Sequence, residues 1–166
     1  MQNLTATQIA SFITGLLVLG ALTLFLLLRN STNSTLELND LEQIGDGMLV
    51  AFQNVNYNFG NAAIPGSVLI NGGKIPSTIV SGTNIQSRWN TPITLTGTGT
   101  AFTAALTNVP QANCVDIETD AGLAQYLSAV VVTGGASRVP PVPVTTASTD
   151  CAAGNNTMTL TYTGHP

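Results

Sequence analysis

The chain has 166 residues, of which 7% are charged and 44% hydrophobic, and its formal net charge at pH 7 is −4. Charged residues make up about 25% of an average globular protein, so Thr, Ser, Asn and Gly supply most of the polarity here. With only four Lys and Arg residues, the chain lacks the basic stripe that nucleic-acid binding requires, and this argues against that class of function.

The first predicted element is an apolar helix over residues 9–28, a stretch without an ionisable side chain. A helix of about twenty residues rises roughly 30 Å, which is the thickness of the hydrocarbon core of a bilayer. No other stretch of the sequence is comparably hydrophobic. The stretch therefore predicts a membrane-spanning helix close to Met1.

Two ordinary explanations of this helix meet difficulties. A secretory signal peptide has basic residues before its apolar run and a small-residue cleavage site after it, and residues 1–8 and the sequence after Leu28 offer neither. An anchor flanked only by Arg29 would place the following residues in the cytoplasm, which conflicts with the export indicated by the cysteines below. A basic leader removed ahead of Met1 would resolve the conflict, so we expect Met1 to be a processed N-terminus.

The helical pattern continues beyond the apolar stretch. Apolar residues recur at steps of three and four, which mark one helical face: Leu38, Leu41, Ile44, Met48, Phe52 and Val55. The acidic residues of this segment are predicted to fall largely on other faces: Glu37, Asp40, Glu42 and Asp46. We expect one N-terminal helix over residues 1–55, first apolar and then amphipathic, which Gly45 and Gly47 allow to bend.

Residues 56–166 are predicted to form a globular head. The head begins with a connection over residues 57–91 that is rich in Gly, Pro, Asn and Ser, the residues that favour turns. Short apolar pieces at residues 68–70 and 79–80 are expected to pin this connection to the head. Trp89 is expected to fill part of the core rather than to bind a ligand.

A sheet is predicted from residue 92 onward. Residues 93–96 alternate, a Gly-containing turn follows, and residues 101–107 place their larger apolar side chains on one face, which predicts a hairpin. Asn108 and Pro110 suit the start of a short helix that runs towards Ile117.

The rest of the head is predicted to complete the sheet. Residues 127–133 are β-rich, and an irregular stretch with three prolines follows at residues 139–143. In the last segment, Met158, Leu160 and Tyr162 alternate with threonines, which predicts a terminal strand with one buried face. The sum is an α+β fold in which a long N-terminal helix packs on an antiparallel sheet.

The chain contains two cysteines, Cys114 and Cys151. In a reducing compartment they would be separate buried thiols, whereas in an exported protein such a pair is normally bridged. Because the N-terminal membrane segment and the Thr- and Asn-rich body indicate export, we expect a disulfide that bounds residues 114–151 and stabilises the fold by about 4 kcal/mol. A metal site is not expected, because the only His is His165 and the cysteines lie far apart.

The order of these features resembles a type IV pilin, and more specifically a type IVb pilin of the kind that builds the thin pili of conjugative plasmids. The resemblance covers nearly the whole chain and includes the apolar helix, its amphipathic continuation to Val55 and the cysteine pair. It also includes short segments in the same order: GKIPST at 73–78, RWN at 88–90, FTAAL at 102–106, NVP at 108–110 and NTMTLTY at 156–162.

The resemblance implies a life cycle for the chain. A prepilin peptidase would remove a short basic leader and often methylate the new N-terminus, which makes Met1 the mature first residue. The subunit would wait in the inner membrane until an assembly platform and an assembly ATPase insert it into an extracellular helical filament, without a cofactor. Neighbouring copies would then pack through a set of core residues: Ile9, Phe12, Ile13, Leu16, Leu17, Leu19, Leu22, Leu24, Phe25 and Leu26. The disulfide-bounded region and the loop 60–89 would form much of the outer surface.

One position departs from the family pattern. The family usually has Glu at mature position five, where it pairs with a neighbour's N-terminal ammonium in the filament core, and this chain has Thr5. An isolated buried charge is costly, so either neutral hydrogen bonds from Gln2, Asn3 and similar side chains replace the pair or the ammonium stays hydrated. The departure leaves room for a minor pilin or a pseudopilin.

We therefore expect the major structural subunit of a surface filament used for cell–cell contact or attachment, and not an enzyme. The alternatives are a minor or tip pilin that acts as an adhesin and a pseudopilin of type II secretion. The position of His165 offers no preorganised catalytic triad. The acidic residues Asp116, Glu118 and Asp120 lack the glycine and spacing of a calcium loop, and we expect them to form a solvated acidic face.

Overall fold

A computed structural model describes residue 18 and residues 33–164 of the chain. The N-terminal helix is described over residues 33–52 and ends in a single 3-10 turn, η1 (Gln53–Val55). Asn56 and Tyr57 follow with φ angles of 53° and 54°. Two consecutive residues with left-handed backbone cannot continue a right-handed helix, so the chain turns away from the helix axis at this point.

The apolar face of this helix is confirmed, with corrections at both ends. Leu41, Ile44 and Met48 are fully buried, whereas Val55 lies in the 3-10 turn and is 54% exposed. The expectation that the acidic residues lie largely on other faces is wrong for Glu37 and Asp40, which are buried.

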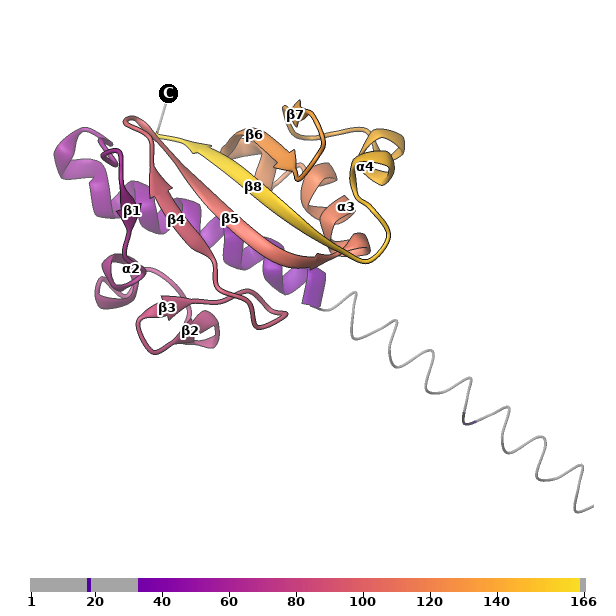
Figure 1. Cartoon of the computed structure of the whole chain (residues 1–166). Coiled ribbons are helices and arrows are strands. Elements are labelled where there is room, and N and C mark those ends of the chain that lie inside the picture. The colour runs from indigo at the N-terminus through magenta and orange to yellow at the C-terminus, as the bar shows by residue number, and fades with distance from the viewer. Residues whose placement is uncertain (1–17, 19–32, 165–166) are drawn as a thin grey trace, which may run out of the picture. The chain divides into compact units, whose positions relative to one another are not determined.

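Six antiparallel strands form the main sheet, in the spatial order β1 (Ala63–Ile64), β4 (Thr94–Gly97), β5 (Ala101–Pro110), β8 (Asn155–Thr163), β6 (Leu127–Val132) and β7 (Ser137–Arg138). The C-terminal strand β8 is therefore hydrogen-bonded on both sides in the centre of the sheet (Figure 1). The predicted hairpin is β4 and β5, and the predicted terminal strand is β8. In β8, Met158, Leu160 and Tyr162 are buried, as the alternation predicted.

The helices of the head lie in the connections between strands. They are α2 (Ser67–Asn71), α3 (Gln111–Thr119) and α4 (Val144–Asp150), with 3-10 turns η2 (Ser77–Ile79) and η3 (Leu123–Gln125). A second, two-stranded sheet pairs β2 (Val80–Ser81) with β3 (Asn84–Ile85). The predicted helix near residue 108 is α3, but it starts after Pro110, because Asn108 still belongs to β5, at a bulge where its φ angle is 57°.

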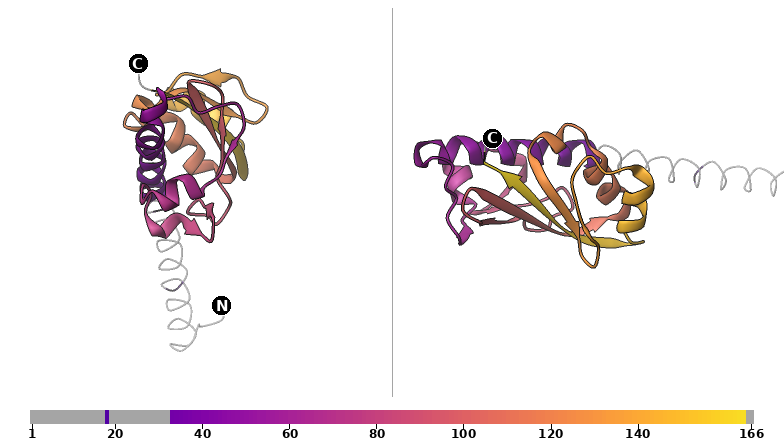
Figure 2. Two further views of the ribbon diagram at one scale, coloured as in Figure 1. Left: turned by 90° about the vertical axis from the view of Figure 1, so that its left-hand side faces the viewer. Right: turned by 90° about the horizontal axis from the view of Figure 1, so that it is seen from above.

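The N-terminal helix covers one face of the sheet, as the two views in Figure 2 show. On that face three aromatic rings lie in contact: Phe59 is tilted against Phe102, with ring centroids 5.1 Å apart, and Phe102 is stacked on Tyr162, with centroids 4.6 Å apart. The alternate residues of the central strands are half-buried or exposed threonines and alanines. One face of the sheet therefore builds the core, and the other carries small polar side chains, as is common for antiparallel sheets.

Two glycines let the helix approach the head closely. A Cβ atom at Gly45 would lie 3.1 Å from Cε1 of Tyr162, and one at Gly47 would lie 3.0 Å from Cβ of Lys74. The helix is continuous through both positions, and both glycines serve as contact points between the helix and the head.

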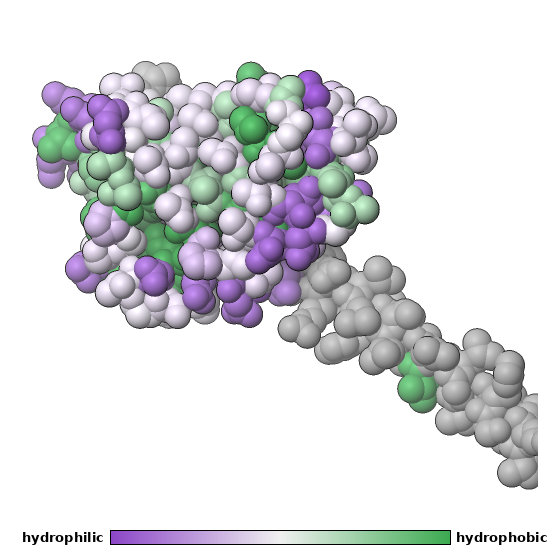
Figure 3. Space-filling view, viewed as in Figure 1, coloured by the Kyte–Doolittle hydropathy of each residue, from purple (hydrophilic) through white to green (hydrophobic). Residues whose placement is uncertain are grey.

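The surface is weakly charged. The face seen in Figure 3 consists largely of residues of intermediate hydropathy. This agrees with a sequence in which 7% of residues are charged.

None of the helices in the described part of the chain is both long enough and apolar enough to cross a membrane. The predicted apolar helix over residues 9–28 lies, except for Val18, outside the described residues.

Candidate functional site

Two places in the head concentrate polar chemistry. The first is a buried ionic contact between the N-terminal helix and the loop that follows it, formed by Glu37, Asp40 and Arg88, which we name the helix anchor. The second is the disulfide-bounded region, residues 114–151.

Arg88 is the centre of the helix anchor. Its Nε lies 2.5 Å from Oδ2 of Asp40 and its Nη2 lies 2.9 Å from Oδ1, so the guanidinium donates two parallel hydrogen bonds to one carboxylate. The same Nη2 donates to Oγ1 of Thr78 at 3.2 Å. The Asp40 side chain is only 3% exposed. A bidentate pair of this kind has a defined geometry as well as a strong attraction, so it fixes where the loop meets the helix.

Glu37 completes the anchor in a less favourable setting. Its Oε2 accepts a hydrogen bond from the backbone N–H of Arg88 at 2.6 Å, while Oε1 is buried without a hydrogen-bond partner. Burial raises the pKa of Glu37 to about 7, and the repulsion from Asp40 adds to this, whereas the hydrogen bond and the charge of Arg88 oppose it. Near neutral pH a substantial fraction of Glu37 is therefore protonated.

The helix is also held at its middle by the last strand. The hydroxyl of Tyr162 donates a hydrogen bond to the backbone carbonyl of Leu41 at 3.1 Å, in a fully buried position. Burial raises the pKa of Tyr162 far above its usual range. The phenol therefore stays neutral and acts as a permanent donor.

Trp89 acts as a structural residue. It is half-buried against the core, and its Nε1 donates to the carbonyl of Thr107 at 3.0 Å, which also accepts from Oγ1 of Thr91 at 2.8 Å. These bonds attach the loop to the bulge of β5, which lies between Leu106 and Val109.

The predicted disulfide is confirmed. Cys114 in α3 and Cys151 just after α4 are bonded, with Cα atoms 5.9 Å apart, and both are buried. Gln111 donates from Nε2 to the carbonyl of Cys151 at 3.1 Å. Asn156 holds the following turn, because its Oδ1 accepts from the N–H of Ala152 and its Nδ2 donates to the carbonyl of the same residue.

The predicted solvated acidic face is wrong, because its three members have different roles. Asp116 is exposed and accepts a hydrogen bond from Oγ of Ser34 at 2.5 Å. Oδ1 of Asp120 accepts from the N–H of Leu123 at 2.6 Å and so starts the 3-10 turn η3. Glu118 is fully buried. Asp116 and Glu118 are two residues apart in α3 and so lie on opposite faces of the helix, one exposed and one buried.

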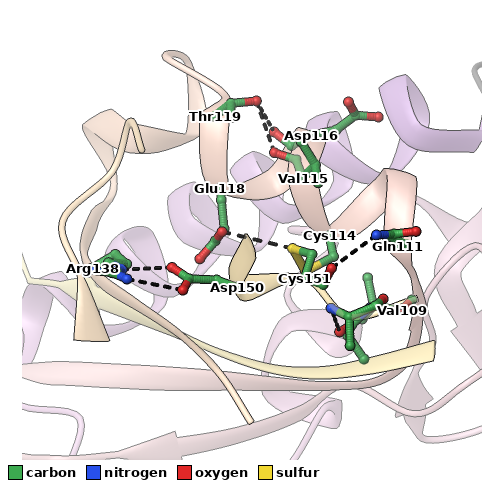
Figure 4. Close-up of a disulfide and its surroundings, with 12 residues drawn as sticks. Val109, Gln111, Cys114, Val115, Asp116, Glu118, Thr119, Arg138, Asp150 and Cys151 are labelled. Atoms are coloured by element: carbon green, nitrogen blue, oxygen red, sulfur yellow. Dashed lines mark hydrogen bonds and ion pairs between the residues drawn. A yellow bond between two sulfur atoms is a disulfide. The ribbon is translucent and has the colours of Figure 1, made fainter. Parts of the chain in front are cut away.

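Glu118 lies between the disulfide and an ion pair (Figure 4). Its Oε2 is 3.9 Å from Sγ of Cys151, and its Oε1 has no hydrogen-bond partner. Nearby, Arg138 donates to both oxygens of Asp150, at 2.7 and 3.0 Å. Burial raises the pKa of Glu118 to about 7, the charge of Asp150 raises it further and the charge of Arg138 lowers it.

A pocket of about 170 Å³ opens between β3 and β4. The residues that line it include no charged side chain: Ala63, Ile64, Pro65, Gly66, Asn84, Ile85, Pro92, Ile93, Thr94 and Leu95. Across residues 33–164, no three His, Cys, Asp or Glu side chains come together as a metal site.

Several predicted site residues lie outside the described part of the chain. They are Met1, the predicted processed N-terminus, and Thr5, which stands where the family usually has Glu. The whole predicted filament-core set also lies outside: Ile9, Phe12, Ile13, Leu16, Leu17, Leu19, Leu22, Leu24, Phe25 and Leu26.

The helix anchor was missed in the sequence, although a signal was present. Glu37 precedes Leu41 by four residues, which is the same step that joins Ile44 to Met48. It therefore continues the apolar stripe towards the N-terminus, and an acidic residue on such a stripe indicates a buried partner. The identity of that partner, Arg88, cannot be read from the spacing.

Comparison with known proteins gives a consistent result. The sequence profile of the PilS N-terminal family matches residues 32–163. The fold is similar to a type IVb pilin from Salmonella typhi, with 23% identity, a TM-score of 0.58, and coverage of 78% of this chain and 99% of that one. It is also similar to TcpA, a type IV pilin from Vibrio cholerae El Tor, with 14% identity, a TM-score of 0.54, and coverage of 80% and 99%. No curated protein sequence matches the chain.

The first prediction concerns the anchor pair. Arg88→Met should lower the free energy of unfolding by about 2–3 kcal/mol, because the buried charge of Asp40 loses its partner. The double variant with Asp40→Leu should recover most of this loss, because it removes the stranded charge. Urea unfolding of the full chain in mild detergent measures both values. Arg138→Met, at a more exposed bidentate pair, is the matched control and should cost less. Equal losses in the single and double variants would contradict this account.

The second prediction concerns pH. The pKa of Glu37 is about 7 in the folded chain and about 4.3 in an unfolded one, so the folded state binds more protons between these values. Stability should therefore fall as pH rises from about 4.5 to about 7, with Glu37 contributing about 3 kcal/mol of that fall.

Unfolding measured at pH 4, 5, 6, 7 and 8 tests this. Glu37→Gln, which keeps an acceptor for the N–H of Arg88, should flatten the curve, and the slope that remains belongs largely to Glu118. Glu42→Gln, at a more exposed position on the same helix, should flatten it much less. A Glu37→Gln curve parallel to that of the natural chain would show that Glu37 does not titrate in this range.

Proposed function

The chain belongs to the PilS N-terminal family and has the type IV pilin fold, and on that premise we propose that it is the major structural subunit of a type IVb pilus. The observation that carries the proposal is the match over residues 32–163, which includes the amphipathic helix and nearly the whole head. This family and fold are structural, so the proposal assigns no enzymatic activity.

In this proposal the N-terminal helix has two contacts along its length. Residues 9–28 are held in the inner membrane before assembly and pack against neighbouring copies afterwards. Residues 1–55 thus form the assembly segment, and residues 56–166 form the head displayed on the outside.

The described part of the helix has a free face that suits such an assembly. Leu36, Gln43 and Val50 lie on one line along the helix, two turns apart, and are exposed. Leu36 is 39% exposed and Val50 is 43% exposed. Apolar side chains on the solvent side of a helix that already buries its other face support a contact with a second copy.

The assembled pilus is proposed to be an extracellular filament that holds cells together or attaches them, as conjugative thin pili do. Its assembly would require a prepilin peptidase that produces Met1, an inner-membrane platform and an ATPase. The disulfide-bounded region and the loop 60–89 would supply much of the surface that other cells meet.

A minor pilin, such as a tip adhesin, or a type II secretion pseudopilin is a second candidate, favoured by Thr5 in place of the usual Glu. The amount of the chain in surface filaments that have been sheared off separates the candidates. A major subunit dominates that material, whereas a minor one is scarce in it.

The third prediction concerns the apolar segment. Deletion of residues 9–28 should give a head that remains monomeric in solution, because the proposed polymer contact is gone. Sedimentation of the truncated chain and electron microscopy of the same sample provide the measurement. Filaments formed by the truncated chain would rule out residues 9–28 as the assembly contact.

The fourth prediction concerns the free face of the helix. Val50→Glu should reduce the amount of subunit in sheared filaments at least ten-fold, because a charge would enter a contact between copies. It should change the free energy of unfolding by less than about 0.5 kcal/mol, since the site is exposed. Val144→Glu makes the same change at a valine that is 62% exposed on α4, and it should assemble normally. Normal assembly of the Val50 variant would remove this face from the proposed contact.

A further inference from the structure

A carboxyl group lies directly against the disulfide. Glu118 follows Cys114 by one helical turn in α3, and its Oε2 is 3.9 Å from Sγ of Cys151 (Figure 4). The side chain is fully buried, and Oε1 has no partner in the structure. A fully buried carboxyl with one free oxygen needs a reason, because desolvating such a group is costly.

The contact can be a hydrogen bond in only two ways. A disulfide sulfur carries no hydrogen, so in the bonded form the proton must belong to the carboxyl of Glu118. In the reduced form the thiol of Cys151 can instead donate to the carboxylate. The contact therefore places Glu118 where it can take up the proton of Cys151.

The surroundings leave Glu118 available for this exchange. The charged groups that act on it are Asp150 from α4 and Arg138 from β7, and both oxygens of Asp150 are already bound by Arg138. The strands β5 and β8, which also pack on α3, carry no charged side chain. Without an ion pair of its own, the buried carboxylate is a stronger base than an exposed one, which brings it closer to the basicity of a thiolate.

We propose that Glu118 accepts the proton of Cys151 when the Cys114–Cys151 disulfide closes. In the first step a disulfide oxidant, such as oxidised glutathione, forms a mixed disulfide with Cys114 and releases one thiol. In the second step the carboxylate of Glu118 takes the proton from Cys151, and the thiolate attacks Sγ of Cys114. The bond between Cys114 and the oxidant breaks, and the second thiolate leaves and takes up a proton. Two cysteine thiols are oxidised, and one oxidant disulfide is reduced to two thiols.

This role is independent of the filament proposal, because it concerns how the head acquires its disulfide and not what the head assembles into. It differs from a purely structural role of Glu118 in one respect. A structural carboxyl would influence how stable the closed form is, whereas a proton acceptor also sets how the rate of closure depends on pH.

The test uses the full chain in mild detergent, reduced and then mixed with oxidised glutathione. Acid quenching at intervals followed by mass spectrometry of fragments separates the mixed disulfide on Cys114 from that on Cys151 and from the closed form. For the natural chain we expect closure from the Cys114 adduct to accelerate as pH rises through about 7, the pKa of Glu118, and to level off above it, once the carboxylate is fully formed.

Glu118→Gln should close at least ten-fold more slowly at pH 7, and its rate should keep rising towards pH 8–9, as for an unassisted thiol. Asp116→Asn removes an exposed carboxylate from the same helix and should keep the natural rate and profile. Glu118→Asp keeps a carboxyl group but shortens the side chain by one methylene. Its rate of closure should therefore be lower than that of the natural chain and should still level off above pH 7.

Two results would overturn the proposal. One is closure of Glu118→Gln at the natural rate with the natural pH profile. The other is a closure rate in the natural chain that follows thiol ionisation alone, without levelling off above pH 7. This second result needs no variant, so it can be measured even where a substitution prevents folding.

Discussion

The structure depends on the packing of the N-terminal helix against the sheet. One face of this helix is apolar and buried, and the other is exposed to solvent. Leu41, Ile44 and Met48 are removed from water by the sheet, and each such side chain contributes about 1.5–3 kcal/mol to folding. Tyr162, in the central strand of the sheet, contacts Gly45 and donates to the carbonyl of Leu41. The N-terminal helix and the last strand are therefore joined directly, and the opposite face of the helix is exposed.

Polar contacts determine where the loop after the helix and the disulfide-bounded region attach to the rest of the structure. A buried ion pair is weak evidence for net stability, because desolvation offsets its attraction. We interpret the pair of Arg88 and Asp40 as a positioning contact that fixes the loop against the helix. At the other end of the head, the disulfide and the pair of Arg138 and Asp150 perform the same task for the region between Cys114 and Cys151. The two surfaces proposed to meet other cells are thus carried on a fixed frame, although few of their residues are charged.

Periodicity predicted the parts of the fold that bury a regular pattern. The apolar stripe of the helix, except at Val55, the hairpin of β4 and β5 and the alternation in β8 were correct, because each follows from a regular repeat of apolar residues. Periodicity could not find α2, α4 or the short strands of the loop, since elements this small are defined by tertiary contacts. It also misplaced Glu37 and Glu118, because nothing in the local sequence shows that Arg88 or a disulfide will cover them. The pairing of Cys114 with Cys151 was predictable because there are only two cysteines, whereas the carboxyl beside them was not.

The account rests on the claim that residues 9–28 form a contact between copies of the chain and use the bilayer only before assembly. High-resolution electron cryomicroscopy of native surface material tests this most directly. The account predicts ordered helical fibres in which the N-terminal helices of neighbouring subunits pack together along the axis, with the heads outside. Single chains that remain embedded in lipid, with no fibre built from them, would contradict it.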